Sequence, residues 1–419
     1  MRSDASKPLR HRPIVVQKYG GSSVADVEKL GRVADRIVAT RRAGHDVVAV
    51  VSAMGKTTDG LLELAERVAE DARGGSEDAP KGKPPRRELD MLVSTGERVS
   101  MSLLSIAIQA RGEDAISFTG SQCGIITNDR HFDARIIEVR PHRIEDELAR
   151  GRIVIVAGYQ GMSYKREITT LGRGGTDTTA VALAAALQAD RCEIYSDVDG
   201  VYSADPRAVA DASHLPEVDY ATLQEMAASG AKVLCAQALE WARRSGVAIY
   251  ARSTFDPPAG PHRETVVRRL GPAEQRRARA VTCNAKVALL EVDLTPGPST
   301  LSRLLERLAG AGVPVAELAT TKTSATVLLS LLNAPDWRAL AGEIAGLPEV
   351  SLAEDVALVS VVGDGLTDQS SAVARFGEVL ARAGATPRGI FVSALRLAAI
   401  VDADRSLEAQ QALHAAFIG

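Results

Sequence analysis

The stretch from Ile168 to Thr179 carries the residues best suited to chemistry. Three of its residues are glycines, so an anion can approach the backbone of the turn they form. Arg173 offers a planar fork for a carboxylate, and Asp177 offers a counter-charge for an ammonium group or a metal ion. The alternative is a structural glycine-rich turn with an Arg173–Asp177 ion pair.

Two elements must position this stretch. The apolar run Arg152–Ala157 predicts a buried strand before it, and Thr176–Gln188, rich in Ala and Leu, predicts the helix after it. We expect Thr176 or Asp177 to cap that helix. A helix N-terminus offers free N–H groups and the positive end of a dipole, so a phosphate or a carboxylate is its natural ligand.

A second candidate for anion binding lies near the start of the chain. Ile14–Lys18 is a short apolar strand, followed by Gly20, Gly21 and a serine-capped helix predicted over Val24–Thr40. Lys18 therefore stands at the carboxyl end of a strand, where open α/β sheets bind ligands. A solvated lysine is the alternative, but the coincidence of strand end, paired glycines and helix start favours a phosphate-binding role.

The next predicted strand, Val47–Val51, is followed by a segment that only partly matches a nucleotide-binding motif. Gly55-Lys56-Thr57 imitates the end of a P-loop, but that motif needs a glycine five residues before its Gly-Lys pair, and Val50 stands there. The P-loop interpretation therefore fails.

A helix predicted over Glu88–Arg111 contains Glu97 beside a glycine. Glu97 is a candidate partner for an ammonium group. By local sequence alone, a surface glutamate paired with Arg98 is the better interpretation.

Strands alternate with helices up to residue 252, which predicts a largely parallel sheet covered by helices on both faces. After the strand Cys192–Ser196, the acidic loop Asp197–Arg207 suits a metal ion or a ribose, although turns use the same residues. From Phe255 to Arg279 the pattern dissolves into Pro, Gly and Arg, which indicates a domain boundary. Two α+β units of about 65 residues each are expected to follow one another.

The composition limits the class of protein. The 419 residues are 45% hydrophobic, 25% charged and 4% aromatic, with a net charge of −3, which argues against nucleic-acid binding. Four cysteines without C-x-x-C spacing indicate neither a zinc site nor disulfides, so we expect reduced thiols and a cytoplasmic location. No apolar run approaches the roughly 18–20 residues of a membrane span, and Met1–Pro13 is expected to be a frayed tail.

Taken together and in order, several segments of the chain closely resemble the aspartate kinase family. The resemblance covers about residues 14–255 and rests on Lys18–Asp26, Val51–Gly55, Gly96–Arg98, Leu171–Asp177, Ser196–Tyr202 and Gly230–Leu234. The two C-terminal units resemble the paired ACT domains of that family. With this resemblance, a substrate-binding role for Glu97 becomes the preferred interpretation.

The resemblance implies an α/β architecture, the amino-acid kinase fold with a largely parallel sheet between helix layers, followed by two ferredoxin-like ACT domains. The expected parts are a tail over 1–13, a catalytic domain over 14–255, a linker over 256–280 and ACT domains over 281–350 and 351–419.

The implied reaction is transfer of the ATP γ-phosphoryl group to the side-chain carboxylate of L-aspartate, the first step toward lysine, threonine and methionine. Magnesium (Mg2+) would bridge the phosphates, without a protein ligand assigned to it. Lys18 and Asp177 would be catalytic. The residues expected to hold aspartate are Ser52, Thr58, Glu97, Arg173, Thr176 and Asp177, and those expected at ATP are Lys18, Gly20, Gly21, Ser22, Ser196, Asp197, Tyr202, Arg207 and Lys232.

The family also suggests an amino-acid effector at the ACT pair and a homodimer, or a higher homo-oligomer, formed through the ACT domains. Leu294 and Ala394 stand where relatives tend to carry acidic residues, so we expect weak inhibition by lysine and threonine. Two alternatives remain open: a kinase of the same fold that acts on another amino acid, and a catalytically silent ACT-based sensor. The argument against the sensor is that four residues of the expected site are intact, namely Lys18, Arg173, Asp177 and Lys232.

Overall fold

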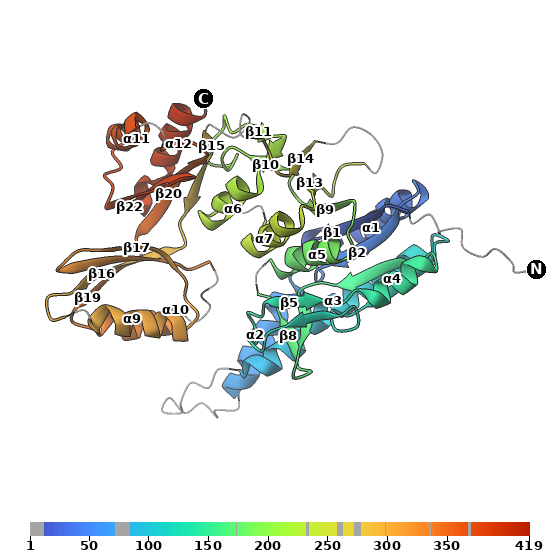
Figure 1. The fold of residues 1–419 in the computed structure, drawn as a ribbon. Helices are drawn as coiled ribbons and strands as arrows, with labels where there is room; N and C mark the ends of the chain where they lie inside the picture. The colour runs from blue at the N-terminus through green and yellow to red at the C-terminus, as the bar shows by residue number, and fades with distance from the viewer. Residues whose placement is uncertain are drawn as a thin grey trace, which may run out of the picture. The chain divides into compact units, whose positions relative to one another are not determined.

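The computed structural model describes residues 12–71, 84–172, 174–231, 234–257, 263–271, 278–297, 299–332, 334, 337–367 and 370–419. These residues form two compact units (Figure 1). The first comprises the described residues of Met1–Val201, Pro216–Tyr220 and Leu234–Arg269, and the second those of Tyr202–Leu215, Ala221–Val233 and Leu270–Gly419.

The first unit contains both strands and helices. Its elements are β1 (Ile14–Tyr19), the 3-10 helix η1 (Gly21–Val24), α1 (Val27–Arg42), β2 (Asp46–Val51), α2 (Thr57–Asp71), α3 (Arg86–Gln109), β3 (Ala115–Phe118), β4 (Ile125–Thr127), β5 (Ile136–Val139), α4 (His142–Ala149), β6 (Ile153–Ala157), β7 (Gln160–Ser163), β8 (Ile168–Thr170), α5 (Gly175–Ala186), β9 (Arg191–Ser196), β12 (Glu217–Val218), α7 (Ala236–Ser245), β13 (Ile249–Ser253) and β14 (Glu264–Val267). Two elements cross the boundary between the units, β10 (Val201–Tyr202) and α6 (Tyr220–Ala228).

In the described part of the chain, eight strands form the main sheet in the order β12-β14-β13-β9-β1-β2-β6-β3. All neighbouring pairs are parallel except β13 and β14, which confirms the predicted sheet. The strands β2 and β6 are buried at every position, as expected for strands covered on both faces. One boundary was wrong: β14 lies within the linker predicted over 256–280, because it continues the sheet beside β13.

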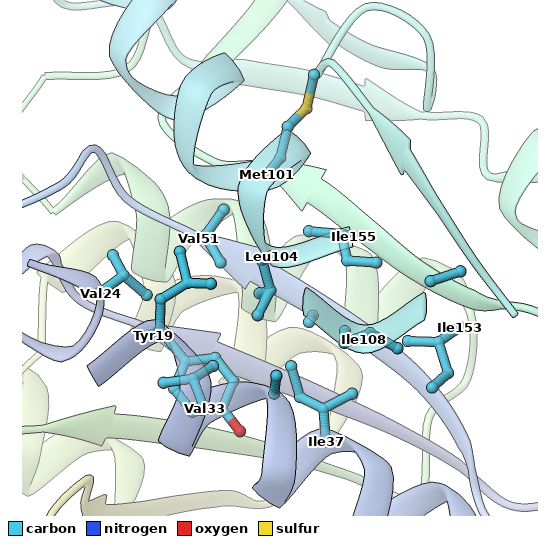
Figure 2. Packing of buried hydrophobic residues seen from close by; sticks show 14 of the residues in the cluster. Tyr19, Val24, Val33, Ile37, Val51, Met101, Leu104, Ile108, Ile153 and Ile155 are labelled. Atoms are coloured by element: carbon cyan, nitrogen blue, oxygen red, sulfur yellow. The ribbon is translucent and has the colours of Figure 1, made fainter. Parts of the chain in front are cut away.

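Helices α1 and α3 cover one face of this sheet. Their apolar side chains pack with Tyr19, Val51 and Ile155 in a buried cluster (Figure 2). Tyr19 points into this cluster. Because side chains alternate along a strand, its neighbour Lys18 points to the opposite face of the sheet. That face is covered by α5, which contacts β1, β2 and β9 (Figure 1).

Helix α3 is long and apolar enough, by length and composition alone, to cross a membrane. Half of its most apolar window is buried inside the protein, where Met101, Leu104 and Ile108 join the cluster of Figure 2. These properties are those of the core helix of a globular domain. A smaller sheet in the order β5-β4-β7-β8 lies in the same unit, and α3 contacts its β8.

The second unit contains two four-stranded sheets, in the orders β17-β18-β16-β19 and β15-β20-β22-β21. Its elements are β11 (His214–Leu215), β15 (Ala278–Asn284), β16 (Val287–Asp293), α9 (Ser299–Gly310), β17 (Val315–Thr320), β18 (Ser324–Ser330), α10 (Trp337–Ala345), β19 (Val350–Ala353), β20 (Val356–Gly363), α11 (Ser370–Arg382), β21 (Gly389–Ser393), β22 (Arg396–Asp402), the 3-10 helix η2 (Ala403–Arg405) and α12 (Ser406–Phe417).

The two α+β domains predicted for the C-terminal part are nested: one is inserted into the chain of the other. Strand β15 pairs antiparallel with β20, for example Val281 with Val361, so the chain starts the second sheet before it builds the first. The prediction that the first ACT domain begins at 281 was therefore wrong, since residues 281–284 belong to the sheet of the second. The first sheet with α9 and α10 occupies the interval from Val287 to Ala353.

Candidate active site

The carboxyl ends of four parallel strands meet at one edge of the main sheet. Tyr19 of β1 lies opposite Val51 of β2 and Tyr195 of β9, and Val51 lies opposite Ala157 of β6. The residues that follow these strands therefore share an edge, as in other open α/β sheets with ligand sites.

Lys18 and Asp177 form an ion pair at this edge. The Lys18 Nζ lies 2.7 Å from the Asp177 Oδ1, and the two side chains are 12% and 13% exposed. Asp177 was predicted to be a counter-charge for an ammonium group or a metal ion, and in the structure the ammonium is that of Lys18. The pair joins the end of β1 to the first turn of α5.

Helix α5 begins differently from the prediction. Its N-cap is Gly174, with a left-handed φ of 74° and no side-chain hydrogen bond, so neither Thr176 nor Asp177 caps the helix. The turn closes through the backbone, because the Gly175 N–H donates to the Gly172 carbonyl over 3.1 Å. A Cβ on Gly174 would lie 2.4 Å from the Cβ of Cys235. The side chains of Thr176 and Asp177 are thereby available to the sheet edge.

Ser52 and Thr176 are also brought together. The Ser52 hydroxyl donates to the Thr176 hydroxyl over 2.9 Å, and the Ser52 N–H donates to the Tyr19 carbonyl over 3.1 Å. Gly158, which follows β6, leaves room for this contact, since a Cβ there would lie 2.6 Å from the Thr176 Cγ2. Two residues predicted to hold the substrate thus lie in one cluster at the start of α5.

Glu97 is buried, with 3% of its surface exposed, so the surface ion pair with Arg98 was the wrong alternative. Its Oε1 accepts a hydrogen bond from the Ala53 N–H over 3.1 Å, directly after Ser52. Among the described residues its Oε2 has no hydrogen-bond partner. Burial raises the pKa of this carboxyl to about 7. A buried carboxylate oxygen without a partner suits a cationic ligand.

The loop after β1 requires a glycine at position 21. A Cβ on Gly21 would lie 2.9 Å from the Ala53 carbonyl oxygen and 3.1 Å from that of Gly55. A Cβ on Gly20 would lie 3.4 Å from the Lys18 Nζ, so backbone without a side chain adjoins the ammonium group. The serine-capped helix was wrong, because η1 intervenes and Asp26 caps α1 by accepting from the Lys29 N–H over 2.9 Å.

The remaining predicted residues are distributed as follows. Ser22 lies in η1 and Thr58 in the first turn of α2. Ser196 ends β9 beside β1, and Asp197 follows it, so both lie at the same sheet edge as Lys18. No group of three or more His, Cys, Asp or Glu side chains suited to a metal ion occurs among the described residues.

All of these substrate- and nucleotide-binding roles stay predictions, and four of the residues lie outside the described part of the first unit. Arg173 and Lys232 lie outside the described residues. Tyr202 and Arg207 belong to the second compact unit, where Arg207 pairs with Asp205 over 2.7 Å.

Tyr159 is a candidate that sequence reasoning missed. It follows Gly158 at the end of β6 and has a left-handed φ of 67°, a conformation that costs a non-glycine residue energy and is concentrated at functional sites. Its carbonyl accepts from the Leu171 N–H over 2.9 Å, and a Cβ on Gly175 would lie 2.9 Å from its Cδ2. The only signal in the sequence was its position just after a predicted strand.

Comparison with known proteins agrees with this geometry. Residues 13–253 match the model of the amino acid kinase family. The chain is 42% identical to an aspartokinase from Mycolicibacterium smegmatis, with 96% of each chain covered. It is 28% identical to E. coli aspartokinase III in its R-state complex with aspartate and ADP, covering 96% of this chain and 99% of that one with a TM-score of 0.81. The T-state complex of the same enzyme with lysine and aspartate gives a TM-score of 0.74 at 28% identity, covering 97% of this chain and 100% of that one.

Proposed function

Since the chain belongs to the aspartokinases of the amino acid kinase family, we propose that it transfers the γ-phosphoryl group of ATP to the side-chain carboxylate of L-aspartate. A carboxylate oxygen of aspartate attacks the γ-phosphorus, the bond from that phosphorus to the β,γ-bridging oxygen breaks, and ADP leaves. The product is 4-phospho-L-aspartate, an acyl phosphate.

This reaction needs no general base, because the attacking carboxylate is already ionised at neutral pH. Catalysis then consists of alignment and of charge stabilisation on the phosphoryl oxygens. Lys18 supplies a positive charge at the sheet edge, and Asp177 holds its ammonium group 2.7 Å away. In the proposed mechanism Asp177 orients Lys18 and takes no proton from the substrate.

Aspartate is recognised through both of its ends in this proposal. The Oε2 of Glu97, to which no described residue donates a hydrogen bond, would receive the substrate ammonium, and Arg173 would bind a carboxylate. Ser52 and Thr176 form a hydroxyl pair next to the Glu97 contact at Ala53 and would supply neutral hydrogen bonds, as would Thr58.

ATP would lie with its phosphates over the loop after β1. Gly20 and Gly21 place backbone without side chains next to Lys18, and Ser22 lies in η1. Ser196 and Asp197 at the end of β9 would line the nucleotide site, and ATP contacts for Tyr202, Arg207 and Lys232 stay predictions from the sequence. Mg2+ would arrive with ATP as part of the substrate and neutralise the β- and γ-phosphates.

The observation that carries this proposal is the position of two opposite charges at one sheet edge. Lys18 is the next-to-last residue of β1, and Glu97 binds the backbone just after the end of β2, which pairs with β1. One site thus offers a cation for a phosphoryl group and an anion for an amino acid.

An assay of ADP release tests the substrate assignment. The enzyme is supplied with MgATP and, separately, with aspartate, glutamate and the other common amino acids. We expect turnover with aspartate. Turnover only with another amino acid would show a sister kinase of the same fold, and no turnover with any of them would favour the sensor.

The proposal extends to assembly and control. Strands β17 and β21 are edge strands of the two ACT sheets, and they expose Val315, Leu318, Ile390 and Val392. Exposed edges of this kind favour pairing with a second copy, so we propose a homo-oligomer joined through the ACT domains, with an amino-acid effector bound there. A cytoplasmic location follows from the need for ATP and free aspartate.

A further inference from the structure

Asp90 is a buried carboxylate that the proposed mechanism does not use. It lies on α3, with none of its surface exposed. Its Oδ1 accepts from the Thr170 hydroxyl over 2.5 Å and from the Phe132 N–H over 3.0 Å, and its Oδ2 lies 2.6 Å from the His131 Nδ1. Burial raises the pKa of this carboxyl, and the hydrogen bonds from Thr170 and His131 oppose the increase.

These contacts join Asp90 to the glycine-rich turn. Thr170 is the last residue of β8, two residues before Gly172. The loop that contains Phe132 meets the same segment again, because the Ala134 N–H donates to the Thr170 carbonyl over 2.8 Å. A Cβ on Gly172 would lie 3.1 Å from the Asp133 Oδ1. The residue that leads into the turn is therefore held twice, by Asp90 through its hydroxyl and by the loop through its carbonyl.

The loop itself depends on Asp90. Phe132 has a left-handed φ of 69°, which costs a non-glycine residue energy unless its surroundings impose it. The Asp90 carboxylate accepts the Phe132 N–H and so compensates for this conformation. Loss of the acceptor would leave a loop that can relax away from Thr170.

Asp90 also shares a helix face with the substrate residue Glu97. Positions 90, 94 and 97 fall on one side of α3 at helical spacing. The carbonyl of Ser94 accepts from the Gln160 side chain over 2.9 Å, and Glu97 accepts from the Ala53 N–H. This face therefore holds three segments of the site: the start of the glycine-rich turn, the strand β7 and the loop after β2.

We propose that Asp90 is a positioning residue for aspartate: through Thr170 and the Phe132 loop it fixes the start of the turn that leads to Thr176, in register with Glu97 on the same helix. This inference rests on the proposed function, because aspartate is the ligand whose binding reports it. The nucleotide phosphates are assigned to the loop after β1, which Asp90 does not contact. Loss of Asp90 should therefore raise the KM for aspartate and leave the KM for ATP unchanged.

The test compares Asp90→Ala with Asp46→Ala. Asp46 is also buried and charged, and it pairs with Arg41 at the amino end of β2, the opposite edge of the sheet. Both variants should lower the melting temperature. For Asp90→Ala we expect the aspartate KM to rise about tenfold to a hundredfold, with kcat within about threefold and the ATP KM within about twofold of the wild type. Asp46→Ala should keep all three constants.

Two further variants keep the inference testable if Asp90→Ala does not fold. Thr170→Val removes only the hydroxyl that donates a hydrogen bond to Asp90. This variant should raise the aspartate KM about threefold to fivefold. Asp90→Asn retains an acceptor for Thr170 and Phe132 and should give an aspartate KM between those of the wild type and Asp90→Ala.

The outcomes separate this inference from the function on which it rests. If the wild-type enzyme is inactive with aspartate, the proposed function is overturned. An active wild type whose Asp90→Ala and Thr170→Val variants keep the normal aspartate KM overturns the inference alone. Equal increases in the aspartate and ATP KM, or the same increases in Asp46→Ala, would show general loosening of the fold and would also overturn it.

Discussion

The ammonium group of Lys18 and the carboxylate of Asp177 lie 2.7 Å apart and connect the end of β1 to the first turn of α5. Each side chain is largely buried, so the pair is held in one geometry by its surroundings. A fixed cation of this kind can meet charge that develops on a transferred phosphoryl group without first reorganising.

Replacing Lys18 tests that role. Lys18→Ala should lower kcat by about a hundredfold to a thousandfold, with a smaller change in the aspartate KM, because one preorganised donor to the transition state is lost. Steady-state kinetics with both substrates measure the effect. Lys29→Ala, which removes an exposed partner of Asp26, is the matched control and should behave like the wild type. A kcat for Lys18→Ala equal to that of the control would remove Lys18 from the mechanism.

Aspartate binding should depend on pH through Glu97. The pKa of this carboxyl is raised to about 7 by burial, so the group is mainly protonated below that pH. Only the ionised form attracts the substrate ammonium. The apparent affinity for aspartate should therefore rise as the pH increases through about 7 and become constant above about 8.

The variant Glu97→Gln supplies the control for this titration. It should raise the aspartate KM about tenfold to a hundredfold and abolish the change in KM near pH 7. Glu88→Gln, which lies on the same helix in an exposed pair with Arg87, should keep both the KM and its pH profile. An unchanged pH profile in Glu97→Gln would assign the titration to another group.

Control by lysine and threonine is expected to be weak. Leu294 packs against the hydrophobic core of the first ACT sheet, and the neighbouring Asp293 accepts hydrogen bonds from the backbone and the hydroxyl of Thr295. Loss of one buried charged contact to an effector lowers its affinity by roughly tenfold to a hundredfold. Activity is measured while lysine, threonine and both together are titrated. Half-inhibition below about 1 mM would show that the effector site has been retained.

The local sequence pattern was sufficient to predict the main sheet and part of the candidate site. Buried apolar strands that alternate with amphipathic helices predicted a largely parallel sheet, and the position of Lys18 at a strand end predicted its place at the ligand edge. Both inferences use only the period of the side chains and the geometry of parallel strands.

Other features depend on contacts between residues far apart in the chain. The burial of Glu97 comes from the loop after β2, which the sequence around Glu97 does not encode. The pairing of β15 with β20 spans a whole inserted sheet, so the prediction of consecutive units failed. The start of α5 was missed because a left-handed glycine at position 174 closes the turn that a threonine or aspartate cap was expected to close.

Trapping of the product tests the central claim most directly. The enzyme is incubated with MgATP, L-aspartate and hydroxylamine, which converts an acyl phosphate into a hydroxamate. We predict aspartyl hydroxamate in an amount that matches the ADP released, and none when ATP or Mg2+ is omitted. ADP release with aspartate but without any hydroxamate would contradict phosphorylation of the aspartate carboxylate.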